Sequence, residues 1–287
     1  MPNTFLTPNI IAREALMVLR NNAVMANLVH RDYSSEFVAN KGDKISIRKP
    51  AKFEAKEFNG SAIEVQDAAE NKVDVTMDKL LDVSFAVTSK EMALSIEDFS
   101  QQLLVPAMQA FADKIDGYLI ALAGAITANK VVQADAVTAV DVVDARKFLT
   151  SHAAPLTERR FVYSTGVEAD LLKTDLFVNA SAVGDAGTAL REASLGRKFG
   201  MDFYVDQNMD SGTARAVAFH KNAFALVTRM LEQPQGAAKS AIVNYDGFGL
   251  RVVYDYDIKS KTDVVSIDML CGVKTLDENL AAIIAAS

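Results

Sequence analysis

Hydrophobic and polar positions follow two different periods along the chain, and these periods indicate its elements. Ile45 and Ile47 alternate with polar residues, and the same period-2 pattern recurs over residues 73–77 and 83–87. Alternation of this kind is typical of strands with one buried face. The three runs therefore predict strands, the first of which ends near Pro50, because proline cannot donate to a sheet ladder.

The first predicted strand leads into a β-hairpin. Asn59-Gly60 is the dipeptide that most readily adopts positive φ at both central positions of a type I′ turn. The arms on either side are mostly charged or small, and their few apolar residues, among them Phe53 and Phe58, cannot form a core. A lone two-stranded hairpin is only marginally stable in water. It must therefore pack either on its own subunit or on another molecule.

A long helical pattern follows. It begins at Ser95, a capping residue followed by acids that complement the helix dipole. Apolar residues then recur at steps of three and four, which predicts a helix over residues 96–123. The apolar face consists of Leu104, Met108, Phe111, Ile115, Leu119 and Leu122.

The polar face of this helix is expected to include Gln109, Asp113 and Asp116. Pro106 falls on the same face, where it is expected to bend the helix. At about 1.5 Å per residue, a helix of ~27 residues is roughly 40 Å long. Such a helix would cross almost the entire molecule.

Shorter elements flank this region. Thr7-Pro8 predicts the start of an amphipathic helix near the N-terminus. After residue 130, Thr138 and Thr165 each precede an acid by three residues, which predicts two capped helices, with a strand at residues 160–163 between them. Further strands are expected at 201–205, on both sides of a tight turn within 216–227, and on both sides of a turn at 259–261.

Composition limits the classes of protein that fit. The chain has 287 residues, half of them hydrophobic, enough for one large domain or two smaller ones. Its net charge of −7 argues against a general polyanion-binding surface. The single cysteine, Cys271, excludes an intramolecular disulfide framework and fits a reducing compartment. We expect neither a signal peptide nor a membrane span, since the longest apolar stretch, residues 118–126, is too short.

Motifs for chemistry are incomplete. His30-Arg31-Asp32 matches a kinase catalytic loop in three letters, but Phe37 replaces the metal-binding asparagine. Asp206, Asn208 and Asp210 are spaced like the start of a calcium loop, but Ser211 stands where glycine is required, so a surface turn is the simpler interpretation. His220 is most simply a residue at the end of a strand. We expect no catalytic residues, no cofactor and no metal site.

The order of elements resembles the major capsid protein of tailed bacteriophages with the Hong Kong ninety-seven type fold, in the coat-protein branch typified by short-tailed phages. "EDFSQQLLVPAMQAFADKIDGYL" resembles the family's spine helix, and "GDKISIRKPAKF" the entry to its extended loop. "SLGRKFGMDFYVDQNM" resembles a glycine-flanked connection into an axial-domain strand, "VAFHKNAFALVTR" a strand pair, and "GVKTLDENLAAII" the C-terminal end.

This resemblance implies an α+β fold with the family's domains. They are an N-terminal arm (1–40), an extended hairpin loop (41–72), a peripheral domain (73–132) with its spine helix at 96–123, a mixed α/β axial domain (133–250), and C-terminal strands that return to the peripheral domain (251–287). The glycine-rich stretch from Ser181 to Gly200 is then either an axial contact or a flexible surface loop.

The resemblance also implies a function. Copies of the chain would assemble as hexamers and pentamers into an icosahedral shell around double-stranded DNA, without sequence-specific binding. A scaffolding protein and a portal are implied as partners, and assembly in the host bacterial cytoplasm as the location. A tail component or another virion structural protein, and an α/β enzyme with an unrecognised site, remain the alternatives.

In such a family the hairpin would lie across a neighbouring subunit. Aromatic anchors, basic residues and the turn would then form the contact between subunits: Arg48, Lys49, Lys52, Phe53, Lys56, Phe58, Asn59 and Gly60. The other interpretation is that the hairpin packs on its own subunit and its charges are merely solvated.

Overall fold

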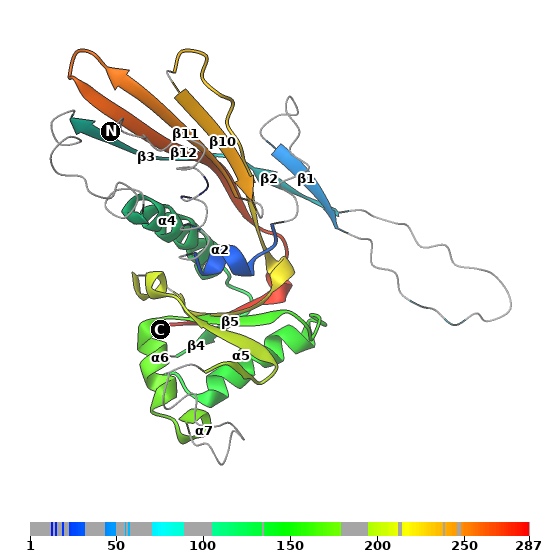
Figure 1. The fold of residues 1–287 in the computed structure, drawn as a ribbon. Coiled ribbons are helices and arrows are strands. Elements are labelled where there is room, and N and C mark those ends of the chain that lie inside the picture. Colours follow the sequence, from blue (N-terminus) through cyan, green and yellow to red (C-terminus); the bar gives the residue numbers. More distant parts are fainter. Residues whose placement is uncertain are drawn as a thin grey trace.

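Two β-sheets and a two-stranded ribbon form the frame of the molecule (Figure 1). The structure, a computed structural model, describes residues 23–31, 44–49, 71–88, 105–133, 135–178, 195–211, 214–237, 239–245 and 248–286, with positions 13, 15, 19, 55 and 57. Helices and strands are both abundant, and the strands are mainly antiparallel. This arrangement confirms the predicted α+β class.

The first sheet has five antiparallel strands. Its order is β10-β11-β12-β3, and β9 pairs with the second half of β12. The pairing of β3 with β12 runs from Lys79↔Cys271 to Thr88↔Thr262 and joins segments far apart in the sequence. The strands are β3 (Lys79–Thr88), β9 (Phe224–Arg229), β10 (Lys239–Tyr245), β11 (Phe248–Asp257) and β12 (Thr262–Thr275).

The inner face of this sheet packs on two helices, α2 (Met25–Leu28) and α4 (Val105–Gly124). Alternate residues of the central strands are buried there, such as Val265, Ile267 and Met269 of β12. The described end of α4 lies one residue from the predicted end at 123, and its predicted first turns lie outside the described residues. A period-2 strand and a 3.6-period helix thus bury their apolar faces against each other.

The second sheet has six strands in the order β4-β13-β8-β5-β7-β6. Its β4–β13 and β5–β7 pairs are parallel and the others antiparallel. Figure 1 shows α5 and α6 below this sheet, with α7 beyond them. The strands are β4 (Lys130–Val132), β5 (Arg159–Tyr163), β6 (Arg197–Lys198), β7 (Met201–Val205), β8 (Ala214–His220) and β13 (Ala281–Ala285).

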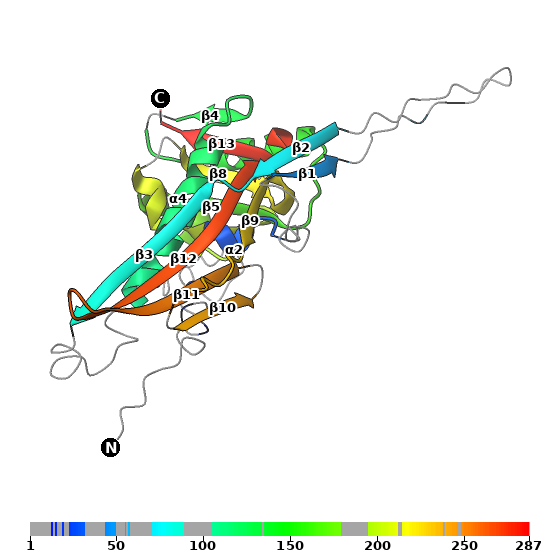
Figure 2. The same ribbon diagram turned by 90° about the horizontal axis from the view of Figure 1, so that it is seen from above.

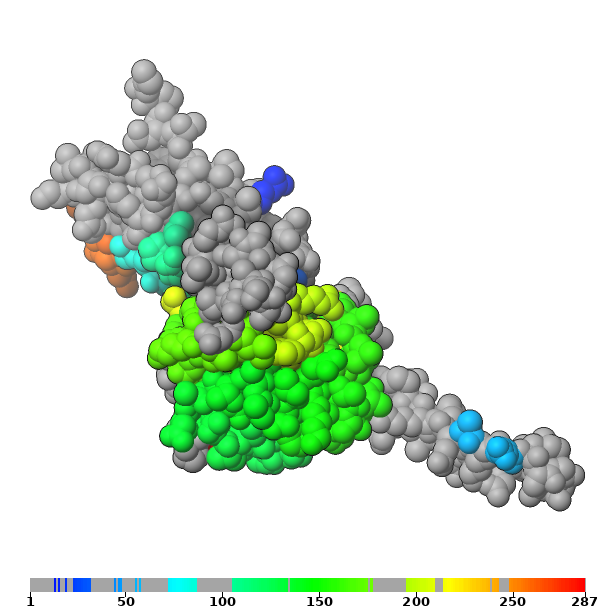
Figure 3. Space-filling model, turned by 90° about the horizontal axis from the view of Figure 1, so that it is seen from below, coloured from blue at the N-terminus to red at the C-terminus, as the bar shows by residue number. Residues whose placement is uncertain are grey.

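The helices beside this sheet are short. They are α5 (Ala139–Ser151), α6 (Thr165–Leu172) and α7 (Asp175–Val178). The described residues also form the 3-10 turns η3 (Gln207–Ser211), η4 (Lys221–Ala223) and η5 (Glu278–Leu280). Seen from below, the second sheet and its helices form one compact block, mainly green in Figure 3. The predicted strands at 160–163 and 201–205 are confirmed as β5 and β7.

The sequence pattern predicts many of the strands but not the sheet that each one joins. β8 and β9 follow each other across the short turn η4, yet β8 belongs to the second sheet and β9 to the first. β10, expected in the domain ending at residue 250, also lies in the first sheet, and β13, expected to return there, joins the second. The physical reason is that alternation indicates which residues are buried but not which strand is the partner.

Candidate functional site

The two-stranded ribbon is the element that most clearly extends away from the sheets (Figures 1 and 2). It consists of β1 (Lys44–Lys49) and β2 (Asn71–Thr76), and β2 is followed almost directly by β3. The strands are antiparallel from Lys44↔Thr76 to Lys49↔Asn71, so every pair is centred on position 60. The period-2 prediction of both strands is confirmed.

One face of the ribbon packs on its own subunit. Ile47, Val75 and Met77 are buried in a small apolar cluster with Val227 and Leu276, separate from the two large cores. The other face is polar, with Lys72 and Asp74 exposed, and Ser46 donates a hydrogen bond to Asp74 across the strands. The base of the ribbon is therefore fixed on the body of the molecule, because its apolar face is covered there.

The structure leaves most of the predicted contact residues untested. Arg48 and Lys49 end β1, and only their backbone is described. Ala55 and Glu57, between the two strands, are exposed. The remaining candidates lie outside the described residues: Lys52, Phe53, Lys56, Phe58, Asn59 and Gly60.

The apolar face of α4 agrees with the prediction for the described residues. Met108, Phe111, Ile115 and Leu119 are buried in the main core. Leu122 is only partly buried at its margin, and Leu104 lies outside the described residues. Pro106 is exposed, as expected for the polar face.

The prediction that Asp116 lies on the polar face of α4 is wrong. This residue is 1% exposed, and its carboxylate accepts hydrogen bonds from the backbone N–H groups of Val24 at 2.7 Å and Ala26 at 2.8 Å. The sequence contains a signal for this position, because residues 108, 112, 116 and 120 fall in one i, i+4 row of the helix. Met108, Ala112 and Ile120 are buried, so the same row buries Asp116.

Burial, together with the nearby charge of Asp206, raises the pKa of Asp116 to about 7, although the hydrogen bonds from the backbone of residues 24–26 act in the opposite direction. Asp206 is itself buried immediately after β7. The expectation of a simple surface turn at Asp206 is therefore wrong, because this turn packs against α4 through the buried Met209.

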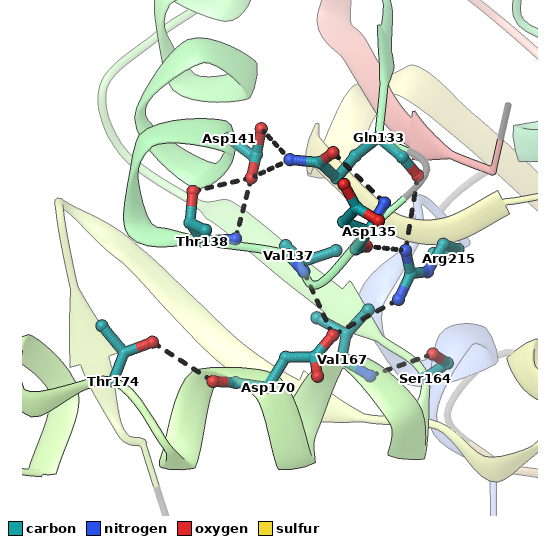
Figure 4. A network of polar contacts seen from close by, with 10 residues as sticks. All are labelled: Gln133, Asp135, Val137, Thr138, Asp141, Ser164, Val167, Asp170, Thr174 and Arg215. Carbon is teal, nitrogen blue, oxygen red and sulfur yellow. Dashed lines mark hydrogen bonds and ion pairs between the residues drawn. The ribbon is translucent and has the colours of Figure 1, made fainter.

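A network of polar side chains connects β4 with the start of α5 (Figure 4). Gln133 donates to both carboxylate oxygens of Asp141, at 3.3 and 3.1 Å. The Oδ2 atom of Asp141 also accepts from the backbone N–H and the hydroxyl of Thr138, both at 2.8 Å. This confirms the predicted cap of α5. The second predicted cap is off by one residue, because Ser164, not Thr165, caps α6.

Arg215 extends the network across the sheet. It lies in β8, donates to the backbone oxygen of Asp135 at 2.6 Å, and pairs with Asp170 of α6 at 3.3 Å (Figure 4). Asp170 also accepts from the backbone N–H of Val137 at 3.1 Å. These contacts hold the connection between β4 and α5 against the sheet, so we interpret their role as structural.

The described residues show little that is suited to catalysis. No group of three metal-ligating side chains occurs within the described ranges. His220 ends β8, as predicted, and its Nδ1 accepts from the backbone N–H of Asn222 at 3.2 Å, while burial lowers its pKa. Burial raises the pKa of Cys271 to about 12, so the thiol is not poised as a nucleophile.

Several apolar side chains are instead exposed on different elements. Ile258 in the β11–β12 turn is 79% exposed, Val140 of α5 is 67% exposed and Leu80 of β3 is 62% exposed. Single exposed apolar residues of this kind are ordinary and do not by themselves mark an interface. In the part of the chain that the structure describes, no helix has both the length and the hydropathy to cross a bilayer.

Residues 72–266 match the model of a family described as phage capsid protein, well over half of the chain. The chain belongs to this phage capsid protein family. It is accordingly a major capsid protein, and its copies form the icosahedral shell of a virion. A comparison with curated proteins found no match.

Solved structures agree with the fold of this capsid protein. A structure from Mycobacterium phage Che8 has a TM-score of 0.70 at 19% identity and covers 91% of this chain and 90% of that chain. The capsid of a native GTA particle has a TM-score of 0.63 at 14% identity and covers 100% of this chain and 95% of that chain. The capsid structure of the cyanophage P-SCSP1u has a TM-score of 0.62 at 15% identity and covers 86% of this chain and 84% of that chain. At these identities the likeness concerns the fold.

Proposed function

We propose that residues 41–72 of this capsid protein form an arm that lies across an adjacent subunit in the shell. The single observation that carries the proposal is the ribbon β1–β2, whose apolar face is covered at its base by the cluster around Val75. A register centred on position 60 supports a hairpin that turns at Asn59-Gly60. A fixed base would hold the arm in one direction, toward a neighbouring copy.

The charge of the arm supports the same partner. Arg48, Lys49, Lys52 and Lys56 are basic residues in a chain of net charge −7. In the proposed contact they meet acidic groups of the adjacent subunit, while Phe53 and Phe58 supply the apolar anchors. Charge complementarity of this kind fixes the register of an interface more than it adds to affinity.

Phe58→Asp tests the arm. The variant should fold, because residues 41–72 contribute only the ribbon base to the described cores, but it should not form shells, since a carboxylate would be buried at the contact without a partner. We expect an unchanged circular dichroism spectrum and subunits or small oligomers in electron micrographs and sedimentation.

Glu57→Asp is the matched control, because Glu57 is exposed and the change keeps its charge. This variant should assemble like the parent protein. Normal shells from Phe58→Asp would rule out the arm as an essential contact.

The finer features of the shell follow from the same proposal. The first sheet with α4 would form the peripheral domain, and the second sheet with α5 and α6 the axial domain around hexamers and pentamers. Assembly in the host cytoplasm would use a scaffolding protein and a portal. The acidic net charge suits a shell that encloses double-stranded DNA without gripping it, and the role would be structural, without catalysis.

A further inference from the structure

Asp116 joins three parts of the subunit that are distant in sequence. It belongs to α4, and its two carboxylate oxygens accept from Val24 and Ala26 at the start of α2. The segment that contains α2 continues to His30, which bonds to β9 through Phe224 and Leu226, at 3.1 and 3.0 Å. One carboxyl group therefore holds the N-terminal segment, residues 23–31, between α4 and the first sheet.

The second sheet reaches the same point through Asp206. This residue follows β7, accepts from the backbone N–H of Asn208 at 2.9 Å, and lies close enough for its charge to act on Asp116. The side chain of Asn208 also donates to Asp113, one turn before Asp116 on α4, at 3.4 Å. The turn η3 thus links the second sheet to the same stretch of α4.

Among the described residues, few other charges lie near this site. Helix α2 carries no acidic or basic residue. The strands packed against α4 in the described part of the chain contribute apolar side chains to the shared core, such as Phe219 of β8, Ile267 of β12 and Ile283 of β13. On β3, Lys79 lies over the ring of Tyr118 and pairs with Asp78. Asp206 is the charged group that acts on the Asp116 carboxyl.

We propose that Asp116 is a protonation-dependent latch that holds the N-terminal segment 23–31 on α4 and releases it more readily as the pH rises toward neutrality. In the closed latch the carboxyl is buried beside a second carboxylate, so the neutral form is favoured there. In the opened latch it is hydrated and ionises at its ordinary pKa of about 3.8.

The direction of the effect follows from proton linkage. Between the ordinary pKa and about 7, the closed form binds a proton that the opened form has lost. Opening therefore becomes more favourable with rising pH through this window and levels off above it. From pH 5 to pH 7 the opening constant should increase on the order of tens of times.

Hydrogen exchange of the assembled full-length protein measures this opening. The amides of residues 23–29 are followed by mass spectrometry at pH 5, 6, 7 and 8, and each rate is divided by its intrinsic chemical rate. We expect protection to fall by roughly tenfold or more between pH 5 and pH 7 and then to remain constant. Protection that is independent of pH over this range overturns the proposal.

Three variants separate the latch from general stability. Asp116→Asn is neutral at every pH and retains a side-chain oxygen, so its protection should not depend on pH. Asp206→Asn keeps the latch but removes the neighbouring charge, so the fall should be smaller and end at lower pH. Asp255→Asn, the same change at an exposed position of β11 away from α4, should behave like the parent protein. If Asp206→Asn and the parent protein give the same profile, the latch is not set by this pair.

Discussion

At the residue scale, Gly272 shows how closely two strands approach. A Cβ atom at this position would lie 2.3 Å from the backbone oxygen of Thr76 and 3.2 Å from the Cα of Met77. Thr76 is where β2 ends and the chain turns into β3, and Gly272 lies in β12. Backbone atoms cannot move aside as a flexible side chain can, so glycine is needed where β12 passes under the base of the ribbon.

Gly272→Ala should therefore destabilise the subunit strongly. Overpacking typically costs about 1–3 kcal/mol, and a contact with backbone belongs at the upper end. Urea unfolding of the two proteins measures the difference. The control is Gly117→Ala in α4, where an added Cβ meets nothing within 4 Å. This change should stabilise by ~1 kcal/mol, because glycine is unfavourable inside a helix. Equal stability of Gly272→Ala and its parent would contradict the close approach.

The burial of a single residue was predictable where the hydrophobic period was clear, and unpredictable where tertiary contacts determined it. The buried positions Met108, Phe111 and Ile115 follow directly from the helical repeat. Asp116 did not, because a charged residue is ordinarily exposed unless partners are present, and its partners lie about ninety residues away in sequence at Val24 and Ala26. The helical row indicates that residue 116 is buried, but the partners that make this burial possible come from tertiary contacts that a local pattern does not contain.

At the element scale, short local motifs are the reliable signals. The capping box of α5 is complete, since Thr138 and Asp141 bond to each other's backbone as the sequence pattern requires. The box depends only on residues three positions apart, so it can form independently of the rest of the fold. The turn predicted at 259–261 between two alternating runs is also confirmed, since β11 ends at Asp257 and β12 begins at Thr262.

Asp141→Asn tests the contribution of this cap. Burial opposes ionisation of Asp141, but the hydrogen bonds from Thr138 and Gln133 prevail and lower its pKa below 3.8. A lowered pKa gives stability that is present above the ordinary pKa and is lost as the pH falls through the lowered one. The variant should therefore be about 1 kcal/mol less stable at pH 7 and approach the parent in strong acid. A constant difference at all pH values, measured by denaturant unfolding, would contradict this account.

At the scale of the whole molecule, the second sheet connects two cores. In β13, Ile283 lies in the core shared with α4 and the first sheet, whereas Ile284 lies in the core between the second sheet and the helices α5 and α6. Both residues are fully buried, and neighbouring strand residues necessarily face opposite sides. The two cores therefore share one wall and should unfold together.

Ile283→Ala and Ile284→Ala test this cooperativity. Each should cost about 2–5 kcal/mol, as large-to-small changes in a core do. In differential scanning calorimetry each variant should keep a single transition at a lower temperature. Two separate transitions in Ile284→Ala, with the first sheet unaffected, would show that the sheets unfold independently.

The topology of the whole molecule was the least predictable level. The stretch from Ala216 to Val227 contains two strands and a short turn, the usual pattern of a hairpin, yet the chain passes from one sheet to the other there. Both strands are almost completely buried, so their side chains do not distinguish one sheet from the other. Strand partners depend on contacts over more than a hundred residues, as between β3 and β12.

The position of Cys271 has a practical consequence for chemical labelling. It is the single cysteine of the chain and lies in the second half of β12. Its pKa of about 12 leaves almost no thiolate at neutral pH. Because alkylating reagents attack the thiolate, the folded subunit should react only when β12 separates from its neighbours. Brief exposure of intact shells to such a reagent would therefore time the opening of the first sheet without any engineered probe.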